Sequence, residues 1–239
     1  MNDAFSSRLF APLYASLCAF AKAGSDSMHM NRYSNANPAR AWLAAAVVAL
    51  GFHAASASAA SVQVSVVDQA GAPVPDAIVY ATPASGKLPA PKPATAIIDQ
   101  VKRQFVPHVS VVQTGTAITF PNKDNFEHDV YSFSPAKKFE LHLYHGVPAN
   151  PVVFDKPGLV VMGCNIHDSM VAYLLVVDTP WFAKTDAAGH AVIDNVPADN
   201  YKLTAWHSRL ADANALPVQS VSAGADAKAA FRLKLSAAE

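Results

Sequence analysis

The sequence predicts an all-β protein with a Greek-key β-sandwich at its centre. The first observation is a series of short runs rich in Val, Ile, Tyr and Phe, each bounded by turn residues. The second is the abundance of turn formers, since 17 prolines interrupt the 239 residues. The third is that six or more of these runs follow one another between residues 95 and 180, a segment that also holds nine of the 22 aromatic residues.

The N-terminal segment has the pattern of a secretory signal peptide. Arg32 and Arg40 precede an apolar run at 41–52, and small residues follow at 54–61. The apolar run is 12 residues long, short of the roughly 20 that a membrane-spanning helix needs. We therefore assign residues 1–60 to a signal peptide, and expect the protein to be periplasmic with no membrane contact after cleavage.

The start of this signal has an unusual extension. We expect cleavage near Ala59 or Ala60, and residues 1–27 form a segment that such signals do not need. Met28 or Met30 is accordingly an alternative start of the chain. A retained N-terminal anchor is the competing interpretation.

The charge balance excludes a broad basic surface. The chain has 18 basic and 18 acidic residues. Removal of residues 1–60 would leave 14 and 16, a net charge of −2. We expect no nucleic-acid partner, because such partners need a basic field.

The central segment contains the clearest strand candidates. Two of them flank a turn at 113–115, and the last is nearly all apolar, as a central strand of a sandwich would be. Loops are expected at 125–128 and 164–170. The predicted strands are 109–112, 116–120, 130–133, 139–144, 151–154, 159–163 and 170–177.

The flanking segments predict further strands. Residues 62–82 form two strands around a turn, and 83–94 contain four prolines, which indicates an extended linker. Strand-like runs return at 191–193 and 201–206, and alternation at 231–235 predicts a closing strand.

Four residues have the donor atoms of a mononuclear copper site. Cys164, His167 and Met170 lie within seven residues, and His128 lies 36 residues before the cysteine. Two imidazoles, one thiolate and one weak thioether are the ligands of an electron-transfer copper centre. Cys18 lies in the segment predicted to be removed, so Cys164 has no intrachain disulfide partner in the processed chain. A buried, inert thiol is the alternative for this cysteine.

Residues 105–180 resemble the cupredoxins, the blue copper proteins. The spacing Cys-x-x-His-x-x-Met is similar to that of the amicyanin ligand loop, and residues 119–130 resemble the strand and loop that carry the first histidine ligand. The resemblance implies one type 1-like copper ion, held by His128, Cys164, His167 and Met170.

Two positions depart from the cupredoxin pattern. Asp129 follows the first histidine where the family usually has Asn, which ties the two ligand loops together, and Glu127 stands where Pro is common. Added negative charge near the metal is expected to favour Cu(II) and to lower the reduction potential.

The flanking segments resemble a carboxypeptidase regulatory-like module, a small transthyretin-like β-sandwich. The matching motifs lie at 67–71 and 185–189. We therefore expect the cupredoxin domain, residues 95–180, to be inserted in or packed beside this sandwich, whose two parts are residues 61–82 and 181–239. The exported region also resembles a family labelled methylamine utilization proteins.

Together these features predict a periplasmic electron-transfer protein with one copper ion. Its partners would be periplasmic redox proteins that donate and accept electrons, and we expect a monomer. The alternatives are a copper-delivery protein without redox turnover and a metal-free structural or ligand-binding sandwich. We expect no enzyme, because the sequence has neither a Gly-x-Ser-x-Gly motif nor a phosphate-binding loop nor a second cluster of copper histidines.

Overall fold

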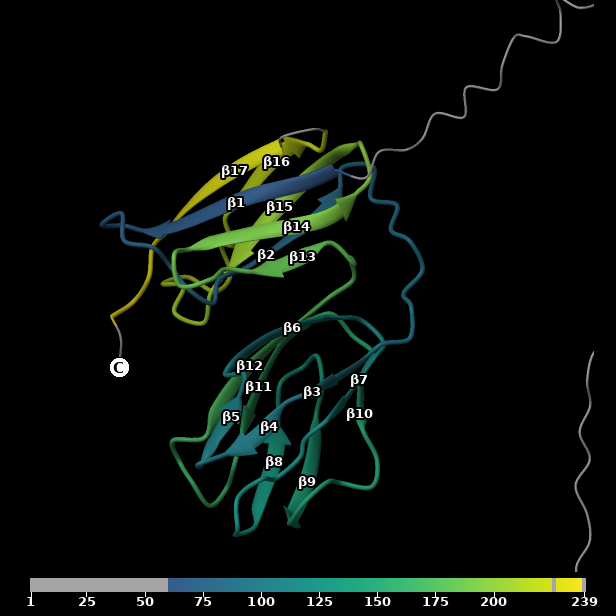
Figure 1. The fold of residues 1–239 in the computed structure, drawn as a ribbon, viewed down its shortest axis with the longest axis vertical. Coiled ribbons are helices and arrows are strands. Elements are labelled where there is room, and N and C mark those ends of the chain that lie inside the picture. The colour runs from purple at the N-terminus through teal and green to yellow at the C-terminus, as the bar shows by residue number, and fades with distance from the viewer. Residues whose placement is uncertain (1–59, 225–226, 238–239) are drawn as a thin grey trace, which may run out of the picture. The chain divides into compact units, whose positions relative to one another are not determined.

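The computed structural model describes residues 60–224 and 227–237 and consists of β-strands (Figure 1). The predicted signal peptide lies outside the described residues except for Ala60, which begins the first strand. The strands are β1 (Ala60–Asp68), β2 (Ile78–Pro83), β3 (Thr95–Ile97), β4 (Asp99–Val101), β5 (Gln104–Val106), β6 (Val109–Gln113), β7 (Thr116–Thr119), β8 (His128–Ser132), β9 (Phe139–Tyr144), β10 (Val152–Phe154), β11 (Gly158–Gly163), β12 (Val171–Val177), β13 (Phe182–Lys184), β14 (His190–Val196), β15 (Asn200–Trp206), β16 (Val218–Ser222) and β17 (Ala227–Leu233). Among these residues, no helix is both long and apolar enough to cross a bilayer.

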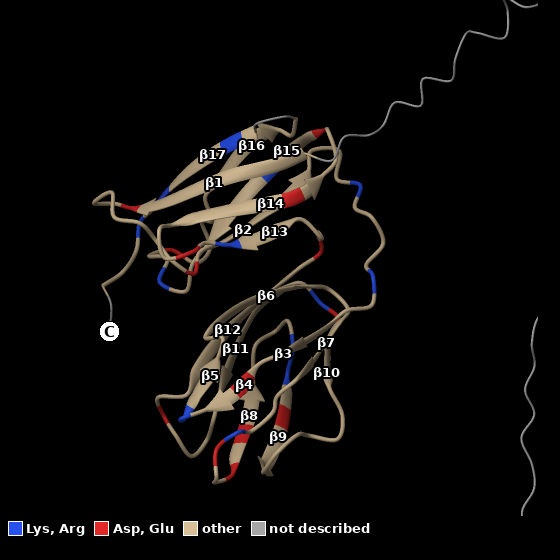
Figure 2. Cartoon of the chain, viewed as in Figure 1, with Lys and Arg blue, Asp and Glu red and all other residues tan. Residues whose placement is uncertain are grey.

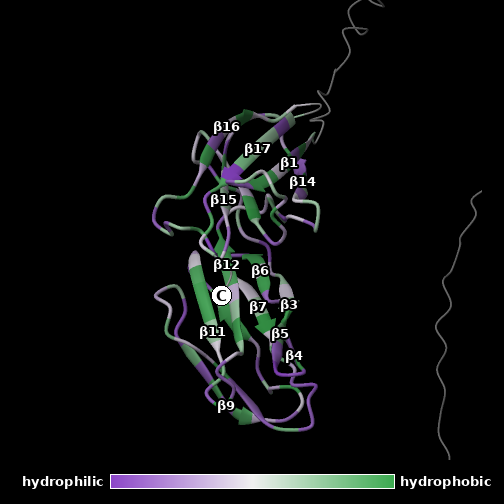
Figure 3. Cartoon of the chain, turned by 90° about the vertical axis from the view of Figure 1, so that its left-hand side faces the viewer, coloured by the Kyte–Doolittle hydropathy of each residue, from purple (hydrophilic) through white to green (hydrophobic). Residues whose placement is uncertain are grey.

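The central strands form the sheets that carry the candidate site. A five-stranded sheet has the order β6-β12-β11-β8-β9, and β10-β7-β3 form a three-stranded sheet. Figure 3 shows the apolar character of β11 and β12. Most of the buried apolar side chains of residues 98–176 pack into one hydrophobic cluster that includes Cys164 and Met170. The prediction of an all-β sandwich protein is confirmed.

The flanking strands form two other sheets. Their orders are β14-β1-β17 and β13-β2-β15-β16. Strands from before residue 84 thus pair with strands from after residue 181, and buried side chains of 62–81 and 191–235 share one hydrophobic cluster. The predicted boundaries at 82, 94 and 180 stay a proposal, as does the likeness to a carboxypeptidase regulatory-like module.

Alternation explains the strand that was easiest to predict. Val62, Val64 and Val66 of β1 are buried, because successive side chains of a strand point to opposite faces and these three face the cluster.

The sequence does not predict five of the strands, which are β3, β4, β5, β13 and β16. Four of them have only three residues, and β16 is mostly exposed, so none has a clear apolar pattern.

Gly189 allows the turn before β14 to approach β1 closely. Its φ is +74°, and a Cβ at this position would lie 2.4 Å from the backbone oxygen of Val66. Gly71 in the same sandwich also has positive φ, but the nearest atom to its added Cβ, Nη1 of Arg232, is 3.9 Å away.

We predict that Gly189→Ala destabilises the protein more than Gly71→Ala does. The Gly71 change carries the left-handed penalty of about 1–2 kcal/mol, whereas the Gly189 change adds an overpacking cost of about 1–3 kcal/mol. Chemical denaturation of both variants measures the difference. Equal losses of unfolding free energy would contradict the close approach.

Candidate metal centre

The candidate ligands come from two parts of the five-stranded sheet. His128 is the first residue of β8, and Cys164 directly follows β11. His167 lies in the loop between β11 and β12. Because β11 pairs with β8 through Gly163 and Tyr131, the loop that follows β11 is carried to the beginning of β8.

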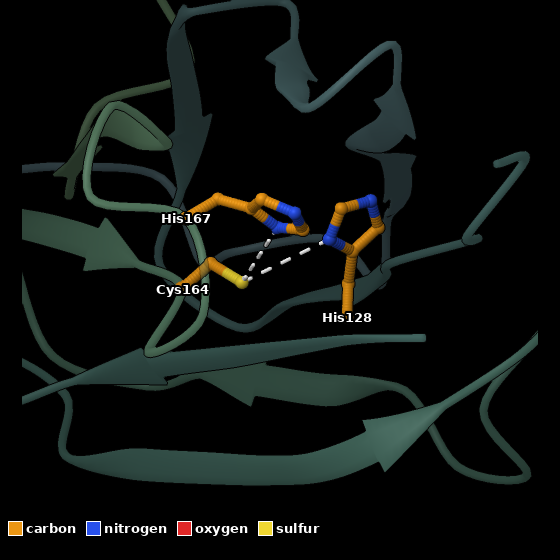
Figure 4. Close-up of side chains that lie close together, drawn as sticks. All are labelled: His128, Cys164 and His167. Atoms are coloured by element: carbon orange, nitrogen blue, oxygen red, sulfur yellow. Dashed lines mark hydrogen bonds between the residues drawn. The ribbon is translucent and has the colours of Figure 1, made fainter. Parts of the chain in front are cut away.

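The structure brings His128, Cys164 and His167 together (Figure 4). The sulfur of Cys164 lies 3.8 Å from Nδ1 of His128 and 3.9 Å from Nδ1 of His167. One donor atom from each residue lies within 4.8 Å of the others. His128 is 0% exposed and Cys164 4% exposed, whereas His167 is partly exposed.

The distances between these donor atoms fit one transition-metal ion. Metal–sulfur and metal–nitrogen bonds of about 2.3 and 2.0 Å would place sulfur and nitrogen roughly 3.5–3.8 Å apart at tetrahedral to trigonal angles. The observed 3.8 Å lies at the long end of this range, and the observed 3.9 Å is just beyond it. Thiolate with two imidazoles is a donor set that suits copper.

Burial raises the pKa of the Cys164 thiol. Hydrogen bonds from the backbone N–H groups of Ile166 and Asp129 to the sulfur act in the opposite direction but do not outweigh it. A thiolate ligand has to be deprotonated, so metal binding at this site would release a proton.

Asp129 joins the two ligand segments. Its Oδ1 accepts a hydrogen bond from the backbone N–H of Asn165 at 2.7 Å, and its Oδ2 accepts one from Nδ2 of Asn165 at 2.6 Å. The side chain is buried, and its carboxylate makes these bonds stronger than neutral ones. The residue that departs from the cupredoxin pattern therefore makes the inter-loop contact itself.

Met170 lies at the end of the ligand loop. It is 1% exposed and belongs to the same hydrophobic cluster as Cys164. Its backbone N–H donates to the carbonyl of His167 at 2.9 Å, which closes the loop before β12. Its role as a fourth ligand stays a prediction.

Sequence reasoning missed three residues around the histidines. Nε2 of His128 lies 2.9 Å from Oδ2 of Asp124. The ring of Phe126 lies 5.0 Å from that of His128 and 5.5 Å from that of His167, between ring centroids. The guanidinium of Arg103 lies 5.2 Å from the centre of the Phe126 ring. The proximity of Asp124 and Phe126 to His128 in sequence was an available signal, whereas Arg103 had none.

Comparisons with known proteins found similar solved structures of copper proteins. No protein family profile matches the chain. No curated protein matches it either. A single-residue mutant of amicyanin in its Cu(I) form has 17% identity over 35% of this chain and 83% of its own, with a TM-score of 0.32. A purple cupredoxin from Nitrosopumilus maritimus has 21% identity over 35% of this chain and 99% of its own, with a TM-score of 0.30.

A third similar structure corrects one prediction. It is the Cu-containing nitrite reductase of Thermus scotoductus, with 26% identity over 38% of this chain and a TM-score of 0.32. This chain covers 24% of the reductase. The prediction that the protein is not an enzyme is wrong, because the structures similar to this chain include an enzyme as well as small cupredoxins.

We predict that Asp129→Ala destabilises the metal-free protein more than Asp129→Asn does. Alanine leaves the Asn165 N–H without its acceptor, at a cost of about 1–3 kcal/mol. Asparagine keeps one acceptor, and Asn165 can turn its own amide to accept from the new N–H. Unfolding by denaturant measures both losses, with the exposed Asp155→Ala as the control. Equal losses for the two Asp129 variants would contradict the proposed contact.

Proposed function

We propose that this protein is a cupredoxin-type copper protein that transfers electrons, with one type 1-like copper site. The ligands would be His128, Cys164 and His167, with Met170 as the weak axial donor. The observation that carries the proposal is the convergence of a sulfur and two imidazole nitrogens at 3.8 and 3.9 Å from two separate segments of the sheet. When bound, copper would supply one-electron chemistry through its Cu(I) and Cu(II) states.

The surroundings of the site favour electron transfer over copper delivery. His128 and Cys164 are almost fully buried, which restricts the access that a metal acceptor protein would need. The donors are attached to the ends of paired strands, and close-packed interiors permit little movement. Ligands that stay in place in both oxidation states keep the reorganisation during electron transfer small.

His167 is the most exposed of the three converging residues, and we infer that electrons pass through its imidazole edge. We further propose that the protein is exported to the periplasm and exchanges electrons there, as a monomer, with other redox proteins. The resemblance to methylamine utilization proteins supports a place near amine oxidation.

We predict that copper-loaded protein has an intense visible absorption from thiolate-to-copper charge transfer, and that Cys164→Ser abolishes it. Serine cannot supply the soft thiolate that produces this transition. Visible spectroscopy of the copper-reconstituted protein checks the outcome, and the exposed Ser169→Ala in the same loop is the control. Colour that survives Cys164→Ser would refute the site.

We predict that Met170→Leu retains copper and has a higher reduction potential. Leucine has no donor atom to stabilise Cu(II), and the axial ligand tunes the potential of such sites. Voltammetry of the wild-type protein and the variant measures the shift. Complete loss of copper would show that Met170 is not a weak axial ligand.

A further inference from the structure

The β4–β5 hairpin has an unusual turn beside the metal centre. Lys102 and Arg103 connect the two strands, and their φ angles are +53° and +58°. The left-handed conformation is unfavourable for residues with a side chain, and two of them in succession persist only when the surroundings hold them. This turn therefore has a partner that stabilises it.

That partner is the carboxylate of Asp124. The backbone N–H of Lys102 donates to Oδ1 at 2.6 Å, and the N–H of Arg103 donates to Oδ2 at 2.9 Å. The left-handed turn directs both N–H groups at the same side chain. In Figure 2 the tip of this hairpin is basic and the loop that precedes β8 contains acidic positions.

The same carboxylate holds a candidate ligand. Oδ2 of Asp124 lies 2.9 Å from Nε2 of His128. A carboxylate only accepts hydrogen bonds, so Nε2 of the neutral imidazole bears the hydrogen and Nδ1 keeps its lone pair. Nδ1 is the atom that lies 3.8 Å from the sulfur of Cys164.

The loop around Asp124 is braced on its other side. Its own N–H donates to Oδ1 of Asn122 at 3.0 Å. Nδ2 of Asn122 donates to the carbonyls of Phe126 and Tyr144 at 2.8 and 2.9 Å. The carboxylate is thus fixed both by its own loop and by the hairpin.

We propose that Asp124, anchored by the backbone of the Lys102–Arg103 turn, is a positioning residue that fixes the tautomer of His128 and directs Nδ1 toward Cys164. The inference rests on the proposed function insofar as the fixed imidazole is a copper ligand. The hairpin then acts on the metal centre without contributing a ligand. Its backbone makes the anchoring contact, while the Arg103 side chain covers Phe126.

The ionisation of Asp124 agrees with this role. Burial raises the pKa of its carboxyl, but hydrogen bonds from Arg103, His128 and Lys102 outweigh that effect and leave the pKa below its ordinary value. The negative form is therefore the one that the turn stabilises.

The test compares Asp124→Asn and Asp124→Ala with the wild-type protein. Asparagine keeps the shape but presents an NH₂ group where the carboxylate faces three donors. Loss of such an outer contact weakens metal affinity by about 10–100-fold, and we expect this for both variants in Cu(I) competition with a chromophoric chelator. The control is Asp155→Asn, an exposed carboxylate that pairs with Lys137.

The second readout does not need copper. The ¹⁵N shifts of His128 in the copper-free protein distinguish a protonated Nε2 from a protonated Nδ1. We expect the Nε2–H tautomer in the wild-type protein and a mixture in both Asp124 variants. An Nδ1–H tautomer in the wild-type protein overturns the proposal. Because this measurement uses the wild-type protein, it tests the proposal even if a variant does not fold.

Substitutions in the turn test whether the backbone or the side chains of Lys102 and Arg103 anchor the Asp124 carboxylate. Arg103→Ala and the double change Lys102→Gly with Arg103→Gly keep both N–H donors, and glycine fits positive φ. We expect both to retain the wild-type copper affinity and the His128 tautomer. A loss as large as that of Asp124→Ala would show that the side chains, not the backbone, anchor the carboxylate.

Failure of the proposed function has a different signature. If the wild-type protein does not bind copper but shows the Nε2–H tautomer, and Asp124→Asn removes it, the positioning role holds and the copper assignment fails. If both Asp124 variants keep the wild-type affinity and tautomer while Cys164→Ser loses its colour, the copper site stands and the positioning role is overturned.

Discussion

The pairing of β8 with β11 is the contact on which the candidate site depends. It brings Gly163 opposite Tyr131, and a Cβ on Gly163 would lie 2.8 Å from the tyrosine ring. Only a glycine lets the ring lie against the end of β11. The next residue is Cys164, so this close approach fixes the position of the cysteine backbone from which the sulfur reaches His128.

Two carboxylates, the buried Asp129 and the partly buried Asp124, then hold the ligand segments in place. Asp129 links the start of β8 to Asn165 in the ligand loop, and Asp124 links His128 to the β4–β5 turn. A charge removed from water is costly unless polar groups replace its hydration. Each carboxylate meets this requirement with donors from a neighbouring segment, so satisfying the charge also fixes the relative position of two parts of the chain.

The apolar surroundings complete the arrangement. Cys164 and Met170 share their cluster with Phe120, Met162 and Leu174, so the sulfur lies at the edge of a packed core. Burial there raises the pKa of the thiol, and a bound cation would have to displace its proton. A metal that binds here would need an affinity for thiolate that offsets this cost, as copper has.

The sequence by itself determined the elements whose cause is local. Alternating valines predict β1, an apolar run predicts all of β12 but begins one residue too early, and the spacing of Cys164 and His167 indicates one side of the site. The sequence predicts a loop at 125–128 that includes His128. In the structure His128 instead begins β8, because it pairs with Tyr144 of β9. That pairing is not encoded in the residues around His128 alone.

Only the tertiary structure decided how the site is supported. The β4–β5 hairpin has no glycine or asparagine at its turn, so Lys102 and Arg103 gave no turn signal. Their left-handed backbone is stable because Asp124, which follows them by 22 and 21 residues, accepts both N–H groups. Local sequence records the preferences of each residue, whereas this turn exists because a distant carboxylate outweighs those preferences.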